Sequence, residues 1–305
     1  MATLVPPGGG ARVPLASDTV LGRSSRCHIV LNDSRVSGHH AALRWTGEAW
    51  EVRDLGSRNG TWVSGSPLPS GQGRLLEAGD TLAFGRETAH WTVADVSAPV
   101  AMAVSASGDW VFADDDLLLL PDAESAEVCI YATDGGWSAE HPDRVDKVED
   151  DDEITVLDET YTLLLPSSFV GTRAAGPSPI DLRSARLELR VSQDEEHVEM
   201  RLLNEEDDRL DLPHRAHLYL LLTLARARLD DRTEGDITTS EEGWRYQDDL
   251  ERQLRIKPNQ FNVVLFRARA QLRKAGVVHA DALIERRRGS GQLRIGVEKL
   301  VVGPL

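Results

Sequence analysis

Short runs of alternating apolar and polar residues dominate the first hundred positions, and turn-forming residues separate them. Five of these runs predict β-strands: His28–Leu31, His40–Trp45, Trp50–Asp54, Thr81–Phe84 and His90–Val93. Short strands between clusters of Gly, Ser and Asn are typical of an all-β sandwich. Residues 1–97 are therefore predicted to form one.

Residues 98–175 keep this strand pattern, with apolar runs at Trp110–Phe112, Leu117–Leu120, Val128–Tyr131, Ile154–Leu157 and Tyr161–Leu165. Two stretches also repeat the first region. Thr46–Glu51 aligns with Thr133–Ser138 at an offset of 87 residues, and Glu77–Thr88 aligns with Glu149–Thr160 at an offset of 72. The missing residues fall where the first region carries an Asn-Gly loop. We expect a second, degenerate copy of the first sandwich.

A stretch rich in Gly, Ser and Pro follows, and residues 176–182 are predicted to be a linker. Residues 183–305 are predicted to form an α+β domain, because helical periodicity replaces strand periodicity. The expected order is two strands (Leu187–Val191, Val198–Leu202), a helix starting near Pro213, a polar loop (Leu229–Glu242), helices near Tyr246–Leu254 and Pro258–Ala275, and a hairpin of Leu283–Arg288 with Gln292–Ile295.

Charge divides the chain unevenly. Of the 34 basic and 50 acidic residues, residues 95–180 hold 3 and 19, a net charge of −16, whereas residues 1–94 carry +1 and residues 181–305 carry −1. Within the last part, Arg252–Arg294 holds 11 basic and 2 acidic residues. Such asymmetry favours a nucleic-acid partner, with a solvated basic surface as the alternative. For the acidic region, a spacer, a dimerisation surface and an inhibitory cover over the basic stretch all stay open.

Three loop segments of the first region combine Arg, Ser or Asn with glycine: Leu21–Ser25, Val36–Ala41 and Asp54–Thr61. A phosphate dianion binds well to one Arg together with several neutral donors, which such loops supply. In these motifs, their order and their spacing, residues 13–93 resemble the forkhead-associated (FHA) domain, a β sandwich that binds phosphothreonine.

The resemblance implies a role for each matched residue. Arg23 and Ser37 would bind the phosphate, and Asn59 would hold the peptide backbone beside it. Arg58 would line the same loop, and Arg35 would be a second cation. Structural residues of this pocket would be Gly22 and Gly60, which permit tight turns, and His40, which braces the loops.

The C-terminal order of strands, three helices and a hairpin resembles the winged helix of OmpR/PhoB type, with Phe261–Lys274 as recognition helix and Ile284–Leu293 as wing. At 100° per residue, Phe261 and Leu265 lie on the core face, and Val263 and Phe266 lie on the opposite face. The residues expected to contact DNA are Asn259, Asn262, Arg267, Arg269, Lys274, Arg286, Arg287 and Arg288. Because the outward face is partly apolar, a protein-binding winged helix is the alternative.

The sequence contains no Walker loop, no Ser/His/Asp or Cys/His arrangement and no zinc spacing, so we expect neither enzyme activity nor a metal or cofactor. Two cysteines, no apolar run of about 20 residues and no signal-like start predict a cytoplasmic protein without a membrane partner.

Together these patterns predict a phosphothreonine-dependent transcriptional regulator. A Ser/Thr kinase would create the phosphothreonine, on itself or on another protein, so the partner would be the kinase or another phosphothreonine-containing protein. The winged helix would bind double-stranded DNA. The alternative is a signalling adaptor whose winged helix binds proteins only. Homodimerisation is left open.

Overall fold

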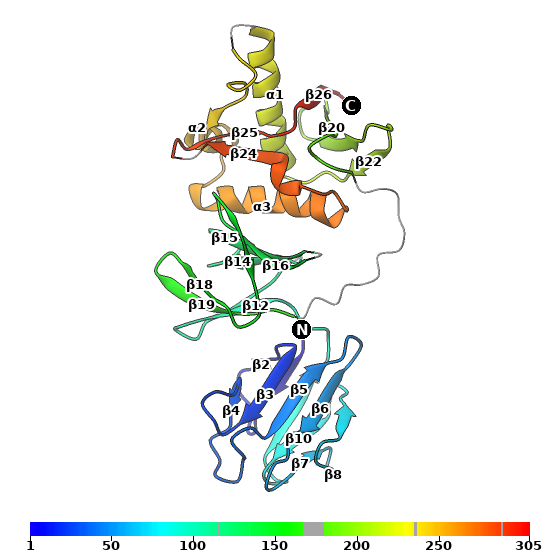
Figure 1. Cartoon of the computed structure of the whole chain (residues 1–305), viewed down its shortest axis with the longest axis vertical. Helices are drawn as coiled ribbons and strands as arrows, with labels where there is room; N and C mark the ends of the chain where they lie inside the picture. Colours follow the sequence, from blue (N-terminus) through cyan, green and yellow to red (C-terminus); the bar gives the residue numbers. More distant parts are fainter. Residues whose placement is uncertain (115, 134, 167–179, 235–236, 288) are drawn as a thin grey trace. The chain divides into compact units, whose positions relative to one another are not determined.

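The computed structural model describes the chain except for residues 115, 134, 167–179, 235–236 and 288 (Figure 1). The chain forms two compact units. The first comprises Met1–Leu118, Tyr131–Ser138 and Lys147–Val170, and the second comprises Leu119–Ile130, Ala139–Asp146 and Gly171–Leu305. Two segments of the middle region thus group with the C-terminal region. The predicted boundaries of residues 98–175 therefore do not coincide with those of the compact units.

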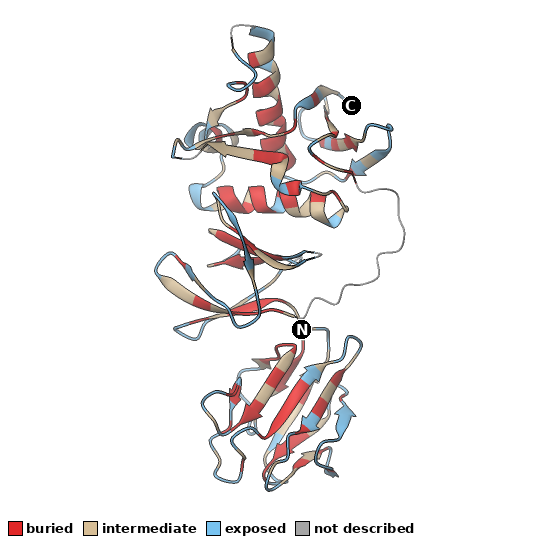
Figure 2. Ribbon diagram, viewed as in Figure 1, coloured by how far each residue is buried: buried red, intermediate tan, exposed pale blue. Residues whose placement is uncertain are grey.

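Two sheets form the first sandwich, with strand orders β4-β3-β5-β6-β9 and β2-β1-β11-β10-β7-β8. The strands are β1 (Thr3–Val5), β2 (Val13–Pro14), β3 (Asp18–Gly22), β4 (Ile29–Val30), β5 (Ala41–Trp45), β6 (Trp50–Asp54), β7 (Thr61–Val63), β8 (Ser66–Leu68), β9 (Gly73–Leu75), β10 (Thr81–Phe84) and β11 (His90–Asp95). Fully buried side chains, red in Figure 2, form its core and include Leu4, Leu43, Trp50 and Leu82. The predicted all-β sandwich is confirmed.

Two four-stranded sheets follow, with orders β13-β12-β19-β18 and β14-β15-β16-β17. Their strands are β12 (Met102–Ser105), β13 (Trp110–Phe112), β14 (Leu118–Leu120), β15 (Val128–Thr133), β16 (Gly136–Glu140), β17 (Val145–Val148), β18 (Glu153–Val156) and β19 (Glu159–Leu164). When strands are matched by their order along the chain, the first of these sheets has the same strand order as β2-β1-β11-β10 of the first sandwich. The second has the same strand order as β3-β5-β6-β9. Among the described strands of the middle region, β4, β7 and β8 have no counterpart.

Side-chain hydrogen bonds also recur between the two regions. The indole Nε1 of Trp50 donates to the carbonyl of Ser97 (3.0 Å), and that of Trp137 donates to the carbonyl of Pro166 (2.9 Å). Trp50 lies on β6, and Ser97 follows β11 in the other sheet of the first sandwich. Trp137 lies on β16, and Pro166 follows β19 in the other sheet of the middle region. Two turns match as well: the hydroxyls of Thr46 and Thr133 donate to the carbonyls of Ala49 and Gly136, and the amides of Glu77 and Glu149 donate to the carboxylates of Asp80 and Asp152.

The linker prediction is wrong at its C-terminal end, while residues 176–179 lie outside the described part of the chain. Ile180 and Leu182 are buried and pack into the C-terminal core. Between them, Asp181 forms a β-bridge with Val278. The alternation of apolar and polar residues at 180–182 thus fits a short extended segment packed on the C-terminal core, although the preceding Gly/Ser/Pro-rich composition predicted a linker.

The C-terminal region combines a four-stranded sheet, three helices and a three-stranded sheet. The first sheet has the order β22-β21-β20-β26, and the second has the order β23-β25-β24. The elements are β20 (Arg186–Val191), β21 (Val198–Leu203), β22 (Arg209–Leu212), α1 (Leu218–Glu234), β23 (Arg245–Tyr246), α2 (Gln247–Leu254), α3 (Pro258–Lys274), the 3₁₀ helix η1 (Ala280–Leu283), β24 (Ile284–Arg287), β25 (Gln292–Ile295) and β26 (Lys299–Pro304). One apolar core joins them.

Two predicted boundaries of α1 are wrong. Pro213 follows β22, which pairs with β21, so it ends a strand instead of starting the helix. At its other end, α1 continues through polar residues to Glu234, because two of its charged side chains are buried anchors. Arg228 Nη1 donates to the carbonyl of Ile295 (2.7 Å), and Asp231 accepts from the amide of Gly243 (2.7 Å).

Candidate functional site

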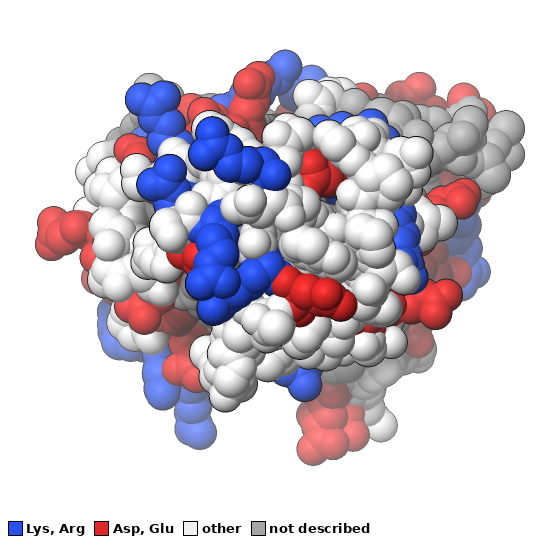
Figure 3. Space-filling view, turned by 90° about the horizontal axis from the view of Figure 1, so that it is seen from below, with Lys and Arg blue, Asp and Glu red and all other residues white. Residues whose placement is uncertain are grey.

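Two loops, between β3 and β5 and between β6 and β7, meet at one end of the first sandwich. Within the first loop, the amide of Arg23 donates to the carbonyl of Ser37 (2.9 Å), and across the two loops the amide of Arg58 donates to Ser37 Oγ (3.0 Å). The amide nitrogen of the Asn59 side chain donates to the carbonyl of Arg35 (2.8 Å). Figure 3 views the structure from below, where these loops lie, and shows Lys and Arg side chains gathered on that face. The structure thus brings all five predicted ligand-binding residues together.

The side chains at this site keep bonding capacity toward solvent. Ser37 Oγ accepts the Arg58 amide, which leaves its own hydroxyl proton for an outside acceptor. Arg23 is exposed, and its Nε donates to the carbonyl of Val36 (3.3 Å), so the two Nη atoms extend beyond the loop. Asn59 uses its nitrogen on the Arg35 carbonyl and keeps its oxygen as an acceptor. One cation, one hydroxyl donor and one amide acceptor suit an anion attached to a peptide backbone.

His40 joins the two loops on the buried side of the site. Its side chain is fully buried, and Nδ1 accepts the amide of Ser37 while Nε2 donates to the carbonyl of Gly60, both at 3.0 Å. These two bonds require the neutral ring with its proton on Nε2. Burial lowers the pKa of His40, against the opposing effects of the Gly60 hydrogen bond and the Asp54 charge. The bracing position expected from the sequence is the one observed.

Sequence reasoning missed a second brace, the carboxylate of Asp54 at the end of β6. It is buried and accepts hydrogen bonds from the amides of Gly56 and Ser57 and from the hydroxyls of Ser57 and Thr61. Burial acts to raise the pKa of Asp54, but these hydrogen bonds outweigh it, and the pKa is lowered. An Asp at the start of a turn often accepts the backbone amide two residues on, as Asp54 does from Gly56, and this signal could have been recognised.

Two glycines hold the loops for different reasons. Gly60 has φ +90°, which favours glycine, as expected for a tight turn. Gly22 instead lies within β3 without a positive φ, and a Cβ there would come within 2.2 Å of the Gly38 carbonyl oxygen. The turn predicted at Gly22 is therefore wrong; the glycine permits close approach of two loops. Gly85, which the sequence did not single out, combines φ +71° with a Cβ position 2.6 Å from the Arg35 carbonyl oxygen.

Residues 19–85 match the family model described as FHA domain. They form an FHA domain. An oxoglutarate dehydrogenase inhibitor from Corynebacterium jeikeium is 38% identical over 81 residues, which cover 26% of this chain and 54% of that protein. The FHA domain-containing protein FhaB of Mycobacterium tuberculosis is 46% identical over 55 residues, covering 18% of this chain and 36% of that protein. The chain therefore spans about half or less of these curated relatives.

Solved structures are similar to about a third of the chain. The FhaA FHA domain, solved with an intracellular protein domain, is 30% identical and covers 30% of this chain and 99% of its own, at a TM-score of 0.28. Mycobacterium tuberculosis EmbR, solved with a low-affinity phosphopeptide, is 30% identical and covers 32% of this chain and 25% of its own, at a TM-score of 0.29.

The residues predicted to contact DNA are only partly accessible. Asn259, Arg267 and Lys274 are exposed on α3, but Asn262 and Arg269 are each only 8% exposed. Val263 and Phe266, expected to face outward, are 4% and 2% exposed. The prediction that the outward face of α3 is open to solvent is therefore wrong, because residues from outside the C-terminal region belong to the same compact unit and cover it.

The covering residues come from Leu119–Ile130 and Ala139–Asp146, here called the acidic segments. Glu140 forms an ion pair with Arg269 and accepts a hydrogen bond from Arg273 Nη1 (3.2 Å). Glu127 Oε2 accepts from Asn262 Nδ2 (3.1 Å). Helical periodicity could not predict this tertiary contact, because it identifies only the face of a helix that packs into the nearest core.

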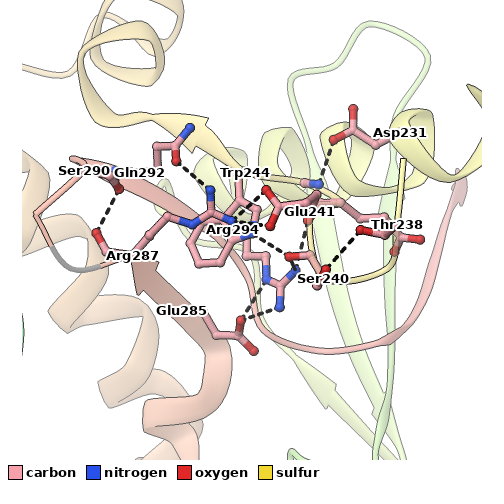
Figure 4. Close-up of polar contacts among 12 residues, drawn as sticks. Asp231, Thr238, Ser240, Glu241, Trp244, Glu285, Arg287, Ser290, Gln292 and Arg294 are labelled. Atoms are coloured by element: carbon pink, nitrogen blue, oxygen red, sulfur yellow. Dashed lines mark hydrogen bonds and ion pairs between the residues drawn. The ribbon is translucent and has the colours of Figure 1, made fainter. Parts of the chain in front are cut away.

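The wing arginines are also engaged. Arg286 Nη2 donates to Asn262 Oδ1 (2.8 Å), and burial lowers the pKa of Arg286. Arg287 donates to both carboxylate oxygens of Glu241 at 2.9 Å. Arg287 and Arg294 lie beside the ring of Trp244, at 4.5 and 4.7 Å from its centroid (Figure 4). Arg288 lies outside the described residues. The hairpin is thus fastened to the loop before β23.

A cleft of about 340 Å³ lies between the wing and the second acidic segment, with Asp143, Arg144, Arg269, Arg286 and Arg287 among its lining residues. Across the described parts of the chain, no group of three or more His, Cys, Asp or Glu residues is arranged to hold a metal ion. Within those same residues, no helix is long and apolar enough to cross a membrane.

Proposed function

We propose that the FHA domain of this protein binds phosphothreonine-containing partner proteins, the products of a Ser/Thr kinase. The observation that carries the proposal is the convergence of Arg23, Ser37 and Asn59, each with free bonding capacity, on a loop pair braced by His40. Arg23 and Ser37 bind phosphate oxygens, and Asn59 binds the backbone next to the phosphothreonine. Arg35 and Arg58 add positive charge at the rim.

The proposal is tested by calorimetry with peptides selected from a degenerate phosphothreonine library and with their unphosphorylated counterparts. Arg23→Ala removes a charge-assisted hydrogen bond of about 1.5–3 kcal/mol and should weaken binding roughly 10- to 100-fold. Arg53→Ala is the matched control, because Arg53 lies on β6 and pairs with Glu51 away from the loops. Equal affinity for phosphorylated and unphosphorylated peptides would refute the proposal.

The C-terminal region is proposed to be a winged helix of OmpR/PhoB type that binds double-stranded DNA. Support comes from the element order, with a sheet, α1, the short strand β23, α2, α3 and the β24–β25 hairpin. The positive charge of Arg252–Arg294 supports it further. On this proposal, the whole chain is a transcriptional regulator that responds to a phosphorylated partner.

One observation favours an adaptor instead: the α3 face already packs against protein, with Phe266 and Val263 buried. Fluorescence anisotropy on fragmented genomic DNA, across a salt series, separates the two functions. DNA binding should weaken steeply with salt, because each neutralised phosphate releases counterions. Binding that is absent at low salt, including in the variants described below, would favour the adaptor.

The middle region is proposed to be a second FHA-like sandwich that has lost its phosphate loops. The shared strand orders and the paired Trp50 and Trp137 hydrogen bonds support a common origin. Because it lacks counterparts of Arg23 and Ser37 and residues 95–180 carry a net charge of −16, it is expected not to bind phosphopeptide.

A further inference from the structure

Both faces of α3 are buried, but only one of them packs against the C-terminal core. Phe261 and Leu265 pack in the C-terminal core. Val263 and Phe266 point away from that core and are nevertheless buried, together with Arg269. A surface helix normally exposes the face opposite its apolar stripe. The second face of α3 is therefore covered by something outside the C-terminal core, and Figure 1 shows β14, β15 and β16 beside the helix.

Charge complementarity defines this second contact. Glu140 is 2% exposed and is shared by Arg269 and Arg273, and Glu127 accepts from Asn262. Carboxylate oxygens here occupy guanidinium and amide groups that phosphate oxygens or base edges would otherwise engage. The acidic segments thus present to α3 the same kind of acceptors that a nucleic acid presents.

The contact is not fully satisfied, as expected of a surface that also serves another partner. Within the described residues, the buried Nε atoms of Arg269 and Arg286 have no hydrogen-bond acceptor. A buried ion pair also gains little overall, because desolvation offsets most of its attraction. The cleft beside Arg269 and Arg286 shows that the packing is incomplete there. A ligand with more acceptors, such as a polyanion, would satisfy these groups better.

Cys129 offers a native reporter of this contact. It is fully buried on β15, the strand that begins directly after Glu127. Burial raises its pKa, with Glu140, Arg273 and Arg269 near enough to influence it. The thiol can therefore react only when the acidic segments separate from α3. Cys27, buried in the FHA domain, is an internal reference.

We propose that the acidic segments mask the second face of α3 by mimicking a polyanion, so that double-stranded DNA and the acidic segments compete for Asn262, Arg269 and Arg286. This inference rests on the proposed DNA binding of the winged helix. It predicts that the described conformation is the closed one, and that removing the carboxylates opens the face without touching its cations.

The test compares full-length wild type with the double variant Glu127→Gln, Glu140→Gln and with a control, Glu149→Gln, Glu153→Gln, which makes the same charge change at exposed positions. Alkylation of Cys129 and Cys27 is followed by mass spectrometry, and binding of mixed-sequence duplex DNA is followed by anisotropy. The double variant should alkylate Cys129 at least about tenfold faster relative to Cys27 and bind DNA at least about tenfold more tightly, the ratio that 1.4 kcal/mol produces. The control should match wild type.

An unchanged Cys129 rate in a folded double variant would overturn the masking. Faster alkylation without tighter DNA binding would overturn DNA as the partner and, with it, the proposed function of the winged helix, while the masking stands. Should both thiols accelerate together, the variant has unfolded, and Glu127→Gln alone then decides, since Glu127 is partly exposed and glutamine keeps an acceptor for Asn262. Wild-type values for both readouts in that milder variant would overturn the inference.

Discussion

Replacing His40 by Leu should destabilise the FHA domain strongly, because it leaves two partly buried backbone groups without a hydrogen-bond partner. The imidazole satisfies the amide of Ser37 and the carbonyl of Gly60 and packs edge-on against Phe84. Each polar group left inside the protein without a partner costs about 1–3 kcal/mol, so the expected loss for the two groups is roughly 2–6 kcal/mol. That is a large part of the roughly 5–15 kcal/mol by which a domain is usually stable.

Hydrogen exchange in increasing urea, read on peptides covering β5 and β6, measures this loss separately from the second compact unit. His39→Leu is the matched control, because His39 is exposed and adjacent, and it should change the free energy of unfolding by no more than about 0.5 kcal/mol. If His40→Leu behaved like the control, the two hydrogen bonds would not stabilise the loops and the argument for a braced site would be wrong.

The pH dependence of the same experiment has a definite sign. The pKa of His40 is lowered in the folded domain, so the unfolded chain binds the proton first. Stability is therefore complete above the ordinary histidine pKa of about 6.5 and falls below it, by at most about 1.4 kcal/mol per pH unit. His40→Leu should remove this part of the acid sensitivity. If the free energy of unfolding of the variant fell with pH as steeply as that of wild type, the acid sensitivity would come from groups other than His40.

Three further predictions follow from the loops and the wing. Gly22→Ala should cost about 1–3 kcal/mol and weaken phosphopeptide binding, since its Cβ would meet the Gly38 carbonyl, whereas Gly38→Ala meets nothing within 4 Å and should be neutral in thermal unfolding. Asp54→Asn should cost about 1.5–3 kcal/mol at pH 7, and because the pKa of Asp54 is lowered, the difference from wild type should shrink as pH falls through that pKa; a constant difference in acid titrations would contradict this. Trp244→Ala should free the wing from the preceding loop and raise hydrogen exchange in β24 and β25, while unchanged exchange there would show that the ion pair of Arg287 suffices.

Much of the FHA domain could be predicted from the sequence, because its strands are short, alternate regularly and are separated by diagnostic turns. The phosphate-loop residues were also recognisable as a set. What could not be predicted were contacts that depend on three-dimensional approach. The close approach of Gly22 to the Gly38 carbonyl is an example, since it does not follow from the local pattern around Gly22.

The C-terminal region shows a different limit. The bounds of α3 were predicted within one residue, yet Val263 and Phe266 were assigned to solvent. Helical periodicity identifies the face that enters the nearest core, but it cannot detect a second partner contributed by residues more than a hundred positions earlier. The end of α1 was missed for a related reason, because Arg228 and Asp231 read as solvent-facing charges although both are buried.

The absence of counterparts to β4, β7 and β8 among the described strands of the middle region has a consequence for valency. With one set of phosphate loops among the described residues, the proposed function has this part of the chain engage one phosphothreonine at a time. A doubly phosphorylated partner would then gain no avidity from one chain, since avidity requires two linked sites that bind simultaneously. A steep response to multiple phosphorylation would then require several copies of this domain gathered on the same partner.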